Sequence, residues 1–171
     1  MAIDTQVFIW GIKKEANAEQ GHMVPKTQAF LNYLWKNHYH ILVPSPVIGE
    51  VLTPVPLTEH SKLLAQIDRL LQIVPFDTAA AGKFAEMMSK YLEDKELRGH
   101  RHEYKILREV VKVDYMIAAI AVSRHAETIY SNDSDIAKFA SSFIEVKTIP
   151  DVPVQVQLFS QNPDYQQIMK P

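Results

Sequence analysis

The sequence predicts an α/β fold in which a central, mainly parallel sheet lies between two layers of helices. Short apolar segments of strand character alternate along the chain with longer segments whose apolar residues recur at helical spacing. Strands that alternate with helices form βαβ units, and these units build parallel sheets that are covered on both faces. We therefore expect a three-layer α/β/α domain over residues 1–149.

The expected strands are short and apolar, and the expected helices carry an apolar face. The strands are expected at residues 1–4, 40–44, 73–76, 128–131 and 144–149. The helices are expected at residues 5–14, 27–39, 45–52, 57–72, 78–94, 113–126 and 134–140. The helix over 27–39, for example, places Phe30, Leu31 and Leu34 on one side.

Local residue chemistry supports two of these helices in particular. At residues 45–52, Ser45 is a suitable N-cap and Pro46 suits the first helical position. Residues 113–126 are apolar almost all round, which predicts a buried helix that Asp114 opens.

The last residues, 150–171, differ from the rest. Val152, Val154, Val156 and Leu158 alternate with Pro or Gln, which indicates an added edge strand or an arm on a partner. The simpler interpretation is an ordered tail that packs on its own domain.

Composition excludes several classes of protein. Hydrophobic residues make up 47% of the 171 residues and charged residues 22%, which is ordinary for a globular domain. No apolar run approaches the roughly 20 residues that span a bilayer, and we expect no secretory signal and no membrane association. The absence of cysteine excludes disulfides and favours a cytoplasmic location. With a net charge of −2, any contact with nucleic acid requires a local basic patch.

Acidic residues stand out by their positions near strand ends. They are Asp4, Glu50, Asp114, Asp133 and, close behind the last, Asp135. Taken singly, Asp4, Asp114 and Asp135 could be helix N-caps, and "SNDSD" could be a plain turn. Glu50 is a poor N-cap and has apolar helical neighbours, so its charge needs a partner or a metal ion.

The predicted topology brings these acids to one edge of the sheet. In a parallel sheet, every helix that follows a strand starts at the carboxyl edge, where ligands bind in open α/β folds. Asp4 and Asp133 lie where a strand passes into a helix, and Glu50 lies in the helix after residues 40–44. Converging carboxylates repel one another unless a hard divalent cation relieves the repulsion. The sequence therefore predicts an acidic pocket for Mg²⁺ or Mn²⁺ that is suited to phosphoryl chemistry.

Taken in order, the acidic motifs resemble the PIN-domain family of metal-dependent ribonucleases. The matching stretches are "DT" with the apolar run after it, "SPVIGEV", "VDYMIAAIA" and "YSNDSDIAKF", and they extend from residue 3 to about residue 140. The resemblance implies an endoribonuclease whose metal ligands are Asp4, Glu50, Asp114 and Asp133. Asp135 would have an outer or second-metal role, and Thr5 and Ser131 would steady the acids.

The resemblance also implies partners. Many prokaryotic members are toxins that an antitoxin protein neutralises, so a VapC-like toxin is the leading subclass. We accordingly expect an RNA substrate, an antitoxin partner and a homodimer. Position 6 is Gln where the family often has Asn, and residues 93–112 are longer and more charged than in a minimal toxin.

A basic segment precedes Asp114 and has two interpretations. It could guide the RNA backbone toward the metal ions, because contacts of Lys and Arg with phosphate dominate affinity. The residues concerned are Arg98, Arg101, Lys105 and Arg108. Alternatively, the segment is a solvated helix in which these cations pair with Glu96, Glu103 and Glu109.

Two other functions compete with ribonuclease activity. A phosphatase that uses an Asp nucleophile is also α/β with an early Asp, but it typically has a second Asp two residues later, where this chain has Gln6. A non-catalytic module that binds RNA or protein could use the same fold, although the four retained acids count against it.

Overall fold

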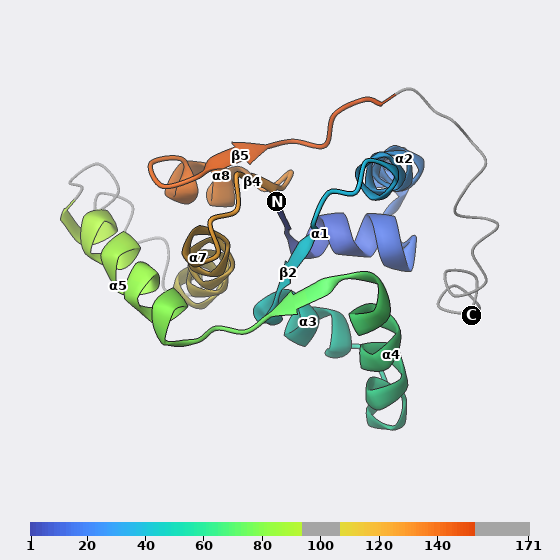
Figure 1. The fold of residues 1–171 in the computed structure, drawn as a ribbon, viewed down its shortest axis with the longest axis horizontal. Helices are drawn as coiled ribbons and strands as arrows, with labels where there is room; N and C mark the ends of the chain where they lie inside the picture. The colour runs from blue at the N-terminus through green and yellow to red at the C-terminus, as the bar shows by residue number, and fades with distance from the viewer. Residues whose placement is uncertain (94–106, 153–171) are drawn as a thin grey trace.

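The computed structural model describes residues 1–93 and 107–152, and it contains one sheet of five parallel strands. The strand order is β3-β2-β1-β4-β5, and every neighbouring pair is parallel (Figure 1). The strands are β1 (Ala2–Ile3), β2 (Leu42–Pro44), β3 (Gln72–Val74), β4 (Thr128–Tyr130) and β5 (Glu145–Lys147). The fold confirms the predicted parallel sheet, and each strand lies inside the range expected for it, except that β3 begins one residue earlier.

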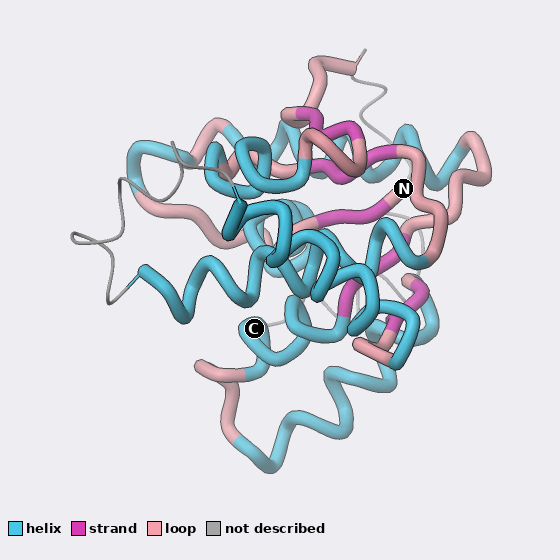
Figure 2. The backbone as a smooth tube through the Cα atoms, turned by 90° about the vertical axis from the view of Figure 1, so that its left-hand side faces the viewer, coloured by secondary structure: helices cyan, strands magenta, loops and turns pink. Residues whose placement is uncertain are grey.

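Helices connect the strands and cover both faces of the sheet (Figure 2). The α-helices are α1 (Thr5–Phe8), α2 (Met23–Lys36), α3 (Ser45–Leu52), α4 (Leu57–Leu70), α5 (Thr78–Glu93), α7 (Leu107–Ser123) and α8 (Ser134–Ala140). Two short helices of other types are the π-helix η1 (Ile9–Lys13) and the 3₁₀-helix η2 (Ala18–Gln20). The architecture is therefore the three-layer α/β/α arrangement that the alternating pattern predicts.

Alternate strand residues point to opposite faces and divide the core into two clusters. Ile3 and Val43 pack with residues of α1, η1, α2, α3 and α4. Ala2, Leu42 and Ile129 pack on the other face with residues of α5, α7 and α8. This period of two is the normal consequence of strand geometry, and it explains why the strands are apolar throughout.

The strand order reverses at β1. The chain builds β1, β2 and β3 in one direction, then returns to place β4 on the other side of β1, followed by β5. Ligands in open α/β sheets bind outside the carboxyl ends of the strands at such a reversal. The fold therefore places its expected binding crevice at the carboxyl ends of β1 and β4.

The helix that contains Asp114 starts earlier than the sequence predicts. Helix α7 begins at Leu107, so Asp114 lies inside the helix, and the prediction that it opens the helix is wrong. The first two turns contain the charged residues Arg108, Glu109 and Lys112. These residues interrupt the apolar pattern, so apolar periodicity does not indicate the start of the helix.

The start of α3 also differs in detail. Pro44 takes the N-cap position and no side chain caps the helix, so the prediction of Ser45 as N-cap is wrong. The Ser45 hydroxyl instead accepts a hydrogen bond of 3.2 Å from the backbone N–H of Phe76. This contact links the start of α3 to the chain just after β3.

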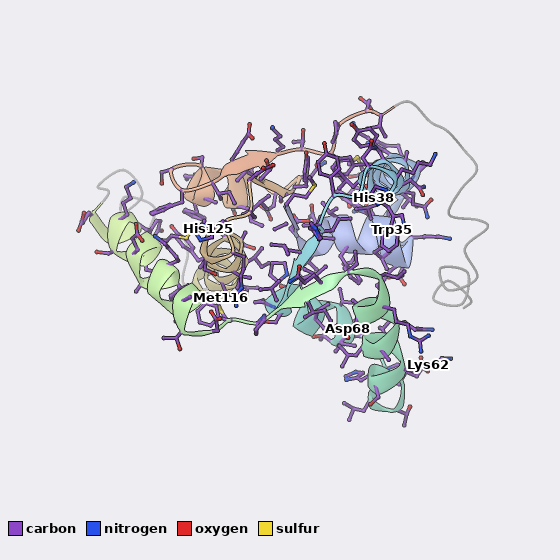
Figure 3. The ribbon with its side chains drawn as sticks, viewed as in Figure 1. Trp35, His38, Lys62, Asp68, Met116 and His125 are labelled. Atoms are coloured by element: carbon purple, nitrogen blue, oxygen red, sulfur yellow. The ribbon has the colours of Figure 1, made fainter. Side chains whose placement is uncertain are left out.

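Helix α4 has a largely solvated surface. Ile67 is its one fully buried residue, whereas Lys62 and Asp68 are exposed (Figure 3). Leu57, at the start of the helix, has 84% of its surface exposed.

Parts of the earlier predictions fall on residues 94–106 and 153–171, which lie outside the described residues. They include the basic residues Arg98, Arg101 and Lys105 and most of the tail predicted at 150–171. At the start of that tail, Asp151 forms an ion pair of 3.0 Å with Lys26, and Val152 packs against the core cluster around α2. Within residues 1–93 and 107–152, no helix has the length and apolarity needed to cross a membrane.

Candidate metal centre

The carboxylate of Asp4 is buried at the carboxyl end of the central strand. It follows β1 directly, caps helix α1, and has only 2% of its surface exposed. Its Oδ1 accepts a hydrogen bond of 2.8 Å from the backbone N–H of Val7, and its Oδ2 accepts one from the hydroxyl of Ser131. Asp4 therefore serves as an N-cap and also belongs to the sheet edge.

Ser131 connects Asp4 to the second acidic strand end. It follows β4, is equally buried, and its Oγ also accepts a hydrogen bond of 2.9 Å from the backbone N–H of Asp133. Asp133 in turn caps α8, where its Oδ1 accepts a hydrogen bond of 2.7 Å from the N–H of Asp135. A single hydroxyl thus joins the residues after β1 and β4, on the two sides of the strand reversal.

Glu50 reaches the same edge from α3, the helix after β2. Its Oε2 accepts a hydrogen bond from the hydroxyl of Thr5, the residue after Asp4. Glu50 is exposed although its neighbours in α3 are apolar, and the hydroxyl of Thr5 is a partner of the kind that its charge was expected to need. Val47, Ile48 and Val51 face the core, while Glu50 lies on the opposite side of the helix.

Asp114 comes to this edge by a different route from the other acids. Helix α7 leads into β4, and a helix that precedes a parallel strand runs in the opposite direction to it. The first half of α7 therefore lies toward the carboxyl edge, with the partly buried Asp114 in it. The sequence shows no recognisable strand just before this helix, so the pattern of strand ends did not place Asp114 at the edge.

Burial shifts the ionisation of Asp4. Loss of solvent raises the pKa of Asp4 from its usual 3.8 to about 6, and the charges of Asp133 and Glu50 also raise it. The hydrogen bonds from Ser131 and from the Val7 N–H act in the opposite direction, because they stabilise the ionised form.

Asp114 responds to the whole group of acids. Burial raises its pKa to about 7, and four neighbouring carboxylates raise it as well. In order of decreasing effect these are Asp133, Glu50, Asp135 and Asp4. Asp114 therefore lies within electrostatic reach of the other four acids.

The carboxylates of these five acids are ligands that suit a hard divalent cation, although their present positions do not yet surround a single ion. Among the described residues, no three Asp, Glu or His side chains are already placed to hold a single metal ion. Carboxylate oxygens are the ligands that Mg²⁺ and Mn²⁺ prefer, and each oxygen has a second lone pair beside the one used in a hydrogen bond. A bound cation would require the carboxylates to draw together, and it would displace the protons that burial and repulsion retain.

A groove that the sequence does not indicate includes Gln6, two residues after Asp4 in the chain. It has a volume of about 450 Å³ and begins at Gln6, in the first turn of α1. Its walls are formed by Gln6, Ile9, Trp10, Glu15, Ala16, Asn17 and Gln20. The spacing of Gln6, Ile9 and Trp10 by three and four residues is the one sequence pattern that could have indicated a shared face.

Comparison with known families now identifies the domain. The model of the PIN domain matches residues 1–141. The chain belongs to the PIN domain family. PIN domains are generally nucleases and typically use divalent metal ions, which agrees with a carboxylate cluster at the sheet edge.

A solved structure supports the same fold. The PIN domain described here is similar to a chain in the crystal structure of VapBC2 from Rickettsia felis bound to a DNA fragment from their promoter. The match has a TM-score of 0.58 and 14% sequence identity, and it covers 87% of this chain and 98% of the other. Comparison with curated protein sequences gives no match.

The pKa of Asp114 predicts that its charge destabilises the metal-free protein. An unfolded Asp titrates near 3.9, whereas Asp114 in the fold titrates at about 7. The fold therefore holds the proton more tightly, and stability falls as pH rises between these two values. Asp114→Asn should raise the melting temperature at pH 8 in a chelator by at least ~2 °C, the shift given by ~1 kcal/mol in a domain of this size. The gain should disappear near pH 4.

The matched control is Asp68→Asn, because Asp68 is exposed on α4. Thermal melts of both variants across pH 4 to 8 provide the measurement. A lower melting temperature for Asp114→Asn at pH 8 would show that the carboxylate stabilises the helix, and would contradict its place in a repelling cluster.

Proposed function

We propose that this PIN domain is an endoribonuclease that hydrolyses RNA phosphodiester bonds with Mg²⁺ or Mn²⁺. The observation that supports the proposal most strongly is the mutual repulsion of the acids at the strand reversal, which contributes to a pKa of about 7 for Asp114. Repelling carboxylates at a ligand-binding edge are costly to the fold unless a cation binds there.

In this proposal, the acids divide into ligands and the groups that position them. Asp4, Glu50, Asp114 and Asp133 hold the metal ions, and Asp135 lies in an outer or second-metal position. Metal ions at such a site activate water and neutralise charge on the phosphate in the transition state.

The hydroxyl groups fix the orientation of these ligands. Ser131 donates to Asp4 and accepts from the backbone of Asp133, so it holds two of the proposed ligands in a fixed relation. Thr5 donates to Glu50 and plays the same part for the acid on α3. Hydrogen-bonding partners of this kind orient metal ligands and tune their affinity.

The similar structure and the exposed apolar side chains both support proposals about the binding partners of this protein. The similar chain comes from a VapBC2 crystal structure, and we propose that this protein is likewise a VapC-like toxin with an antitoxin partner. Large apolar side chains that remain exposed, including Leu57 and Trp35, provide surface for that partner or for a homodimer. Expression with and without the neighbouring reading frame would test toxicity and its neutralisation.

The nuclease assay uses the full chain and single-stranded RNA. We expect cleavage with Mg²⁺ or Mn²⁺ and none with a chelator. Asp114→Asn should reduce the rate more than ~100-fold, because loss of a mere hydrogen-bonding partner of a ligand already costs ~10–100-fold. Ser131→Ala should fall within that smaller range and recover at higher Mn²⁺ concentration, since it weakens the positioning of Asp4.

The Asp68→Asn variant again serves as the control and should retain full activity. Each other outcome supports a different function. RNA binding without cleavage would favour a non-catalytic module, and hydrolysis of phosphate monoesters but not of RNA would favour a phosphatase. Cleavage that persists in the chelator or in Asp114→Asn would contradict the metal-dependent mechanism.

We further propose that the basic segment that precedes Asp114 and ends in the first turn of α7 guides RNA toward the acids. Its residues are Arg98, Arg101, Lys105 and Arg108, and the last of them lies in α7, the helix that contains Asp114. Replacing all four by Gln should weaken RNA binding, and each lost phosphate contact should lower the slope of log affinity against log salt by ~0.7. Binding isotherms at several salt concentrations measure this slope, and Mn²⁺ affinity should not change. An unchanged slope would mean that these cations pair with neighbouring acids instead.

A further inference from the structure

We propose that the groove beginning at Gln6 is a nucleobase subsite, which takes one unpaired base of the RNA next to the cleaved phosphate. This inference rests on the proposed ribonuclease function and adds to it a source of base preference. Four observations support it: the link between the groove and the acids along the chain, the shape of the groove, the chemistry of its walls and its charge.

The groove and the acidic edge are linked along the chain by consecutive residues, although none of the acids lines the groove. Asp4 caps α1, Thr5 binds Glu50, and Gln6 is the next residue and the first wall of the groove. A strand of RNA whose phosphate lies at the acids would therefore have a neighbouring nucleotide beside Gln6. From there the groove follows one face of the helix through Ile9 and Trp10, because these residues are spaced by three and four positions.

A π-helix and a close helix contact shape this wall. Residues Ile9–Lys13 form the rare π-helix η1, a type often found at functional sites. Gly11 lets η1 approach α2, because a Cβ atom at this position would lie 2.4 Å from Leu31 Cδ1 and 2.9 Å from Thr27 Cγ2. The inner side of η1 is thus held against α2, and its outer side forms the groove together with the loop before η2.

The walls combine apolar surface with carboxamides that keep some or all of their hydrogen-bonding groups unused. Ile9 provides apolar surface that is partly exposed, whereas Trp10 has only 3% of its surface exposed and presents little of its ring to the groove. Asn17 caps η2 with its carbonyl oxygen, which leaves its amide group available. Within the described part of the chain, the side chains of Gln6 and Gln20 make no hydrogen bond. A carboxamide offers a donor and an acceptor together, which is the pattern that reads a base edge.

The charge of the groove also fits a base better than a phosphate or an ionic peptide. Among the residues that the structure describes, Glu15 is the one charged residue in the walls of the groove, and it forms an ion pair of 3.3 Å with Lys13. A neutral, amide-lined groove of about 450 Å³ falls within the range of small-molecule sites. A base inside a duplex is stacked and paired, so only an unpaired or flipped base can enter.

Two measurements test the subsite, and the first uses cleavage. Single-stranded RNA with randomised positions around the cleaved bond gives the base preference of the wild-type protein. Gln6→Ala with Gln20→Ala should reduce the preference for the favoured base by ~10-fold, within the range of a bidentate base contact. Gln66→Ala, the same change on α4 outside the groove, should leave it unaltered. If RNA is cleaved with the same preference by the double variant, the subsite is wrong and the proposed nuclease function stands.

The second measurement needs no cleavage. The chain has two Trp residues, so Trp35→Phe leaves Trp10 as the single indole reporter in the groove wall. In a chelator, octamers of A, C, G and U are titrated against Trp10 fluorescence. One of the four octamers should quench the Trp10 fluorescence at a lower concentration than the other three. The double variant Gln6→Ala with Gln20→Ala should raise that octamer concentration ~10-fold, whereas Gln66→Ala should leave it unchanged.

The outcomes of the titration separate the two proposals. Base-dependent quenching that the double variant removes supports the subsite, even if no RNA is cleaved under any condition. Quenching that is absent or equal for all four bases overturns the subsite, and would leave the groove to a protein partner. Equal thermal melts of the variants exclude misfolding as the cause of any loss.

Discussion

The hydrogen bond from Ser131 to the buried carboxylate of Asp4 is the contact on which the rest of the site depends. It joins the residues that follow β1 and β4, the two strands between which the sheet order reverses. The same hydroxyl accepts from the backbone of Asp133, so the positions of both acids follow from one side chain. Without it, a carboxylate with 2% exposure would lose one of its two compensating contacts and become costly to ionise.

The acidic edge implies a compromise between stability and function. Burial and repulsion raise the pKa values of Asp4 and Asp114 toward neutrality, so the metal-free fold carries the cost of ionising them. A ligand that binds the folded state alone returns stability in proportion to its concentration and affinity. A divalent cation at this edge would therefore stabilise the protein and at the same time prepare it for chemistry. Raised carboxylate pKa values of this kind cluster at functional sites.

Much of the fold could be predicted from the sequence because its elements have clear local patterns. The helices at residues 45–52 and 134–140 have the predicted bounds, since apolar periodicity and turn residues mark both ends. The start of α7 could not be predicted in this way, because charged residues interrupt the apolar pattern of its first turns. The exposure of Glu50 was also missed, since neighbours along a helix point in different directions and their apolar character says little about its own.

The candidate site likewise has parts that the sequence predicts and parts that it does not. The acids could be placed at the carboxyl edge because parallel topology brings every strand end there, and capping geometry reinforces the choice of Asp4 and Asp133. The groove could not be foreseen, because its walls come from a π-helix and a loop that no periodic pattern specifies. Nor does the sequence show that a single hydroxyl bridges two acids that are 129 residues apart, since that contact exists only in the folded sheet.

The most direct test of this account is a crystal structure grown with Mn²⁺, with anomalous scattering used to locate the ion. The account predicts a manganese peak at the carboxyl ends of β1 and β4, with oxygens of Asp4 and Asp114 among its ligands and the carboxylates drawn closer together than in the metal-free fold. A peak elsewhere, or no peak at saturating Mn²⁺ with the acids unmoved, would contradict the claim that these carboxylates form a metal centre.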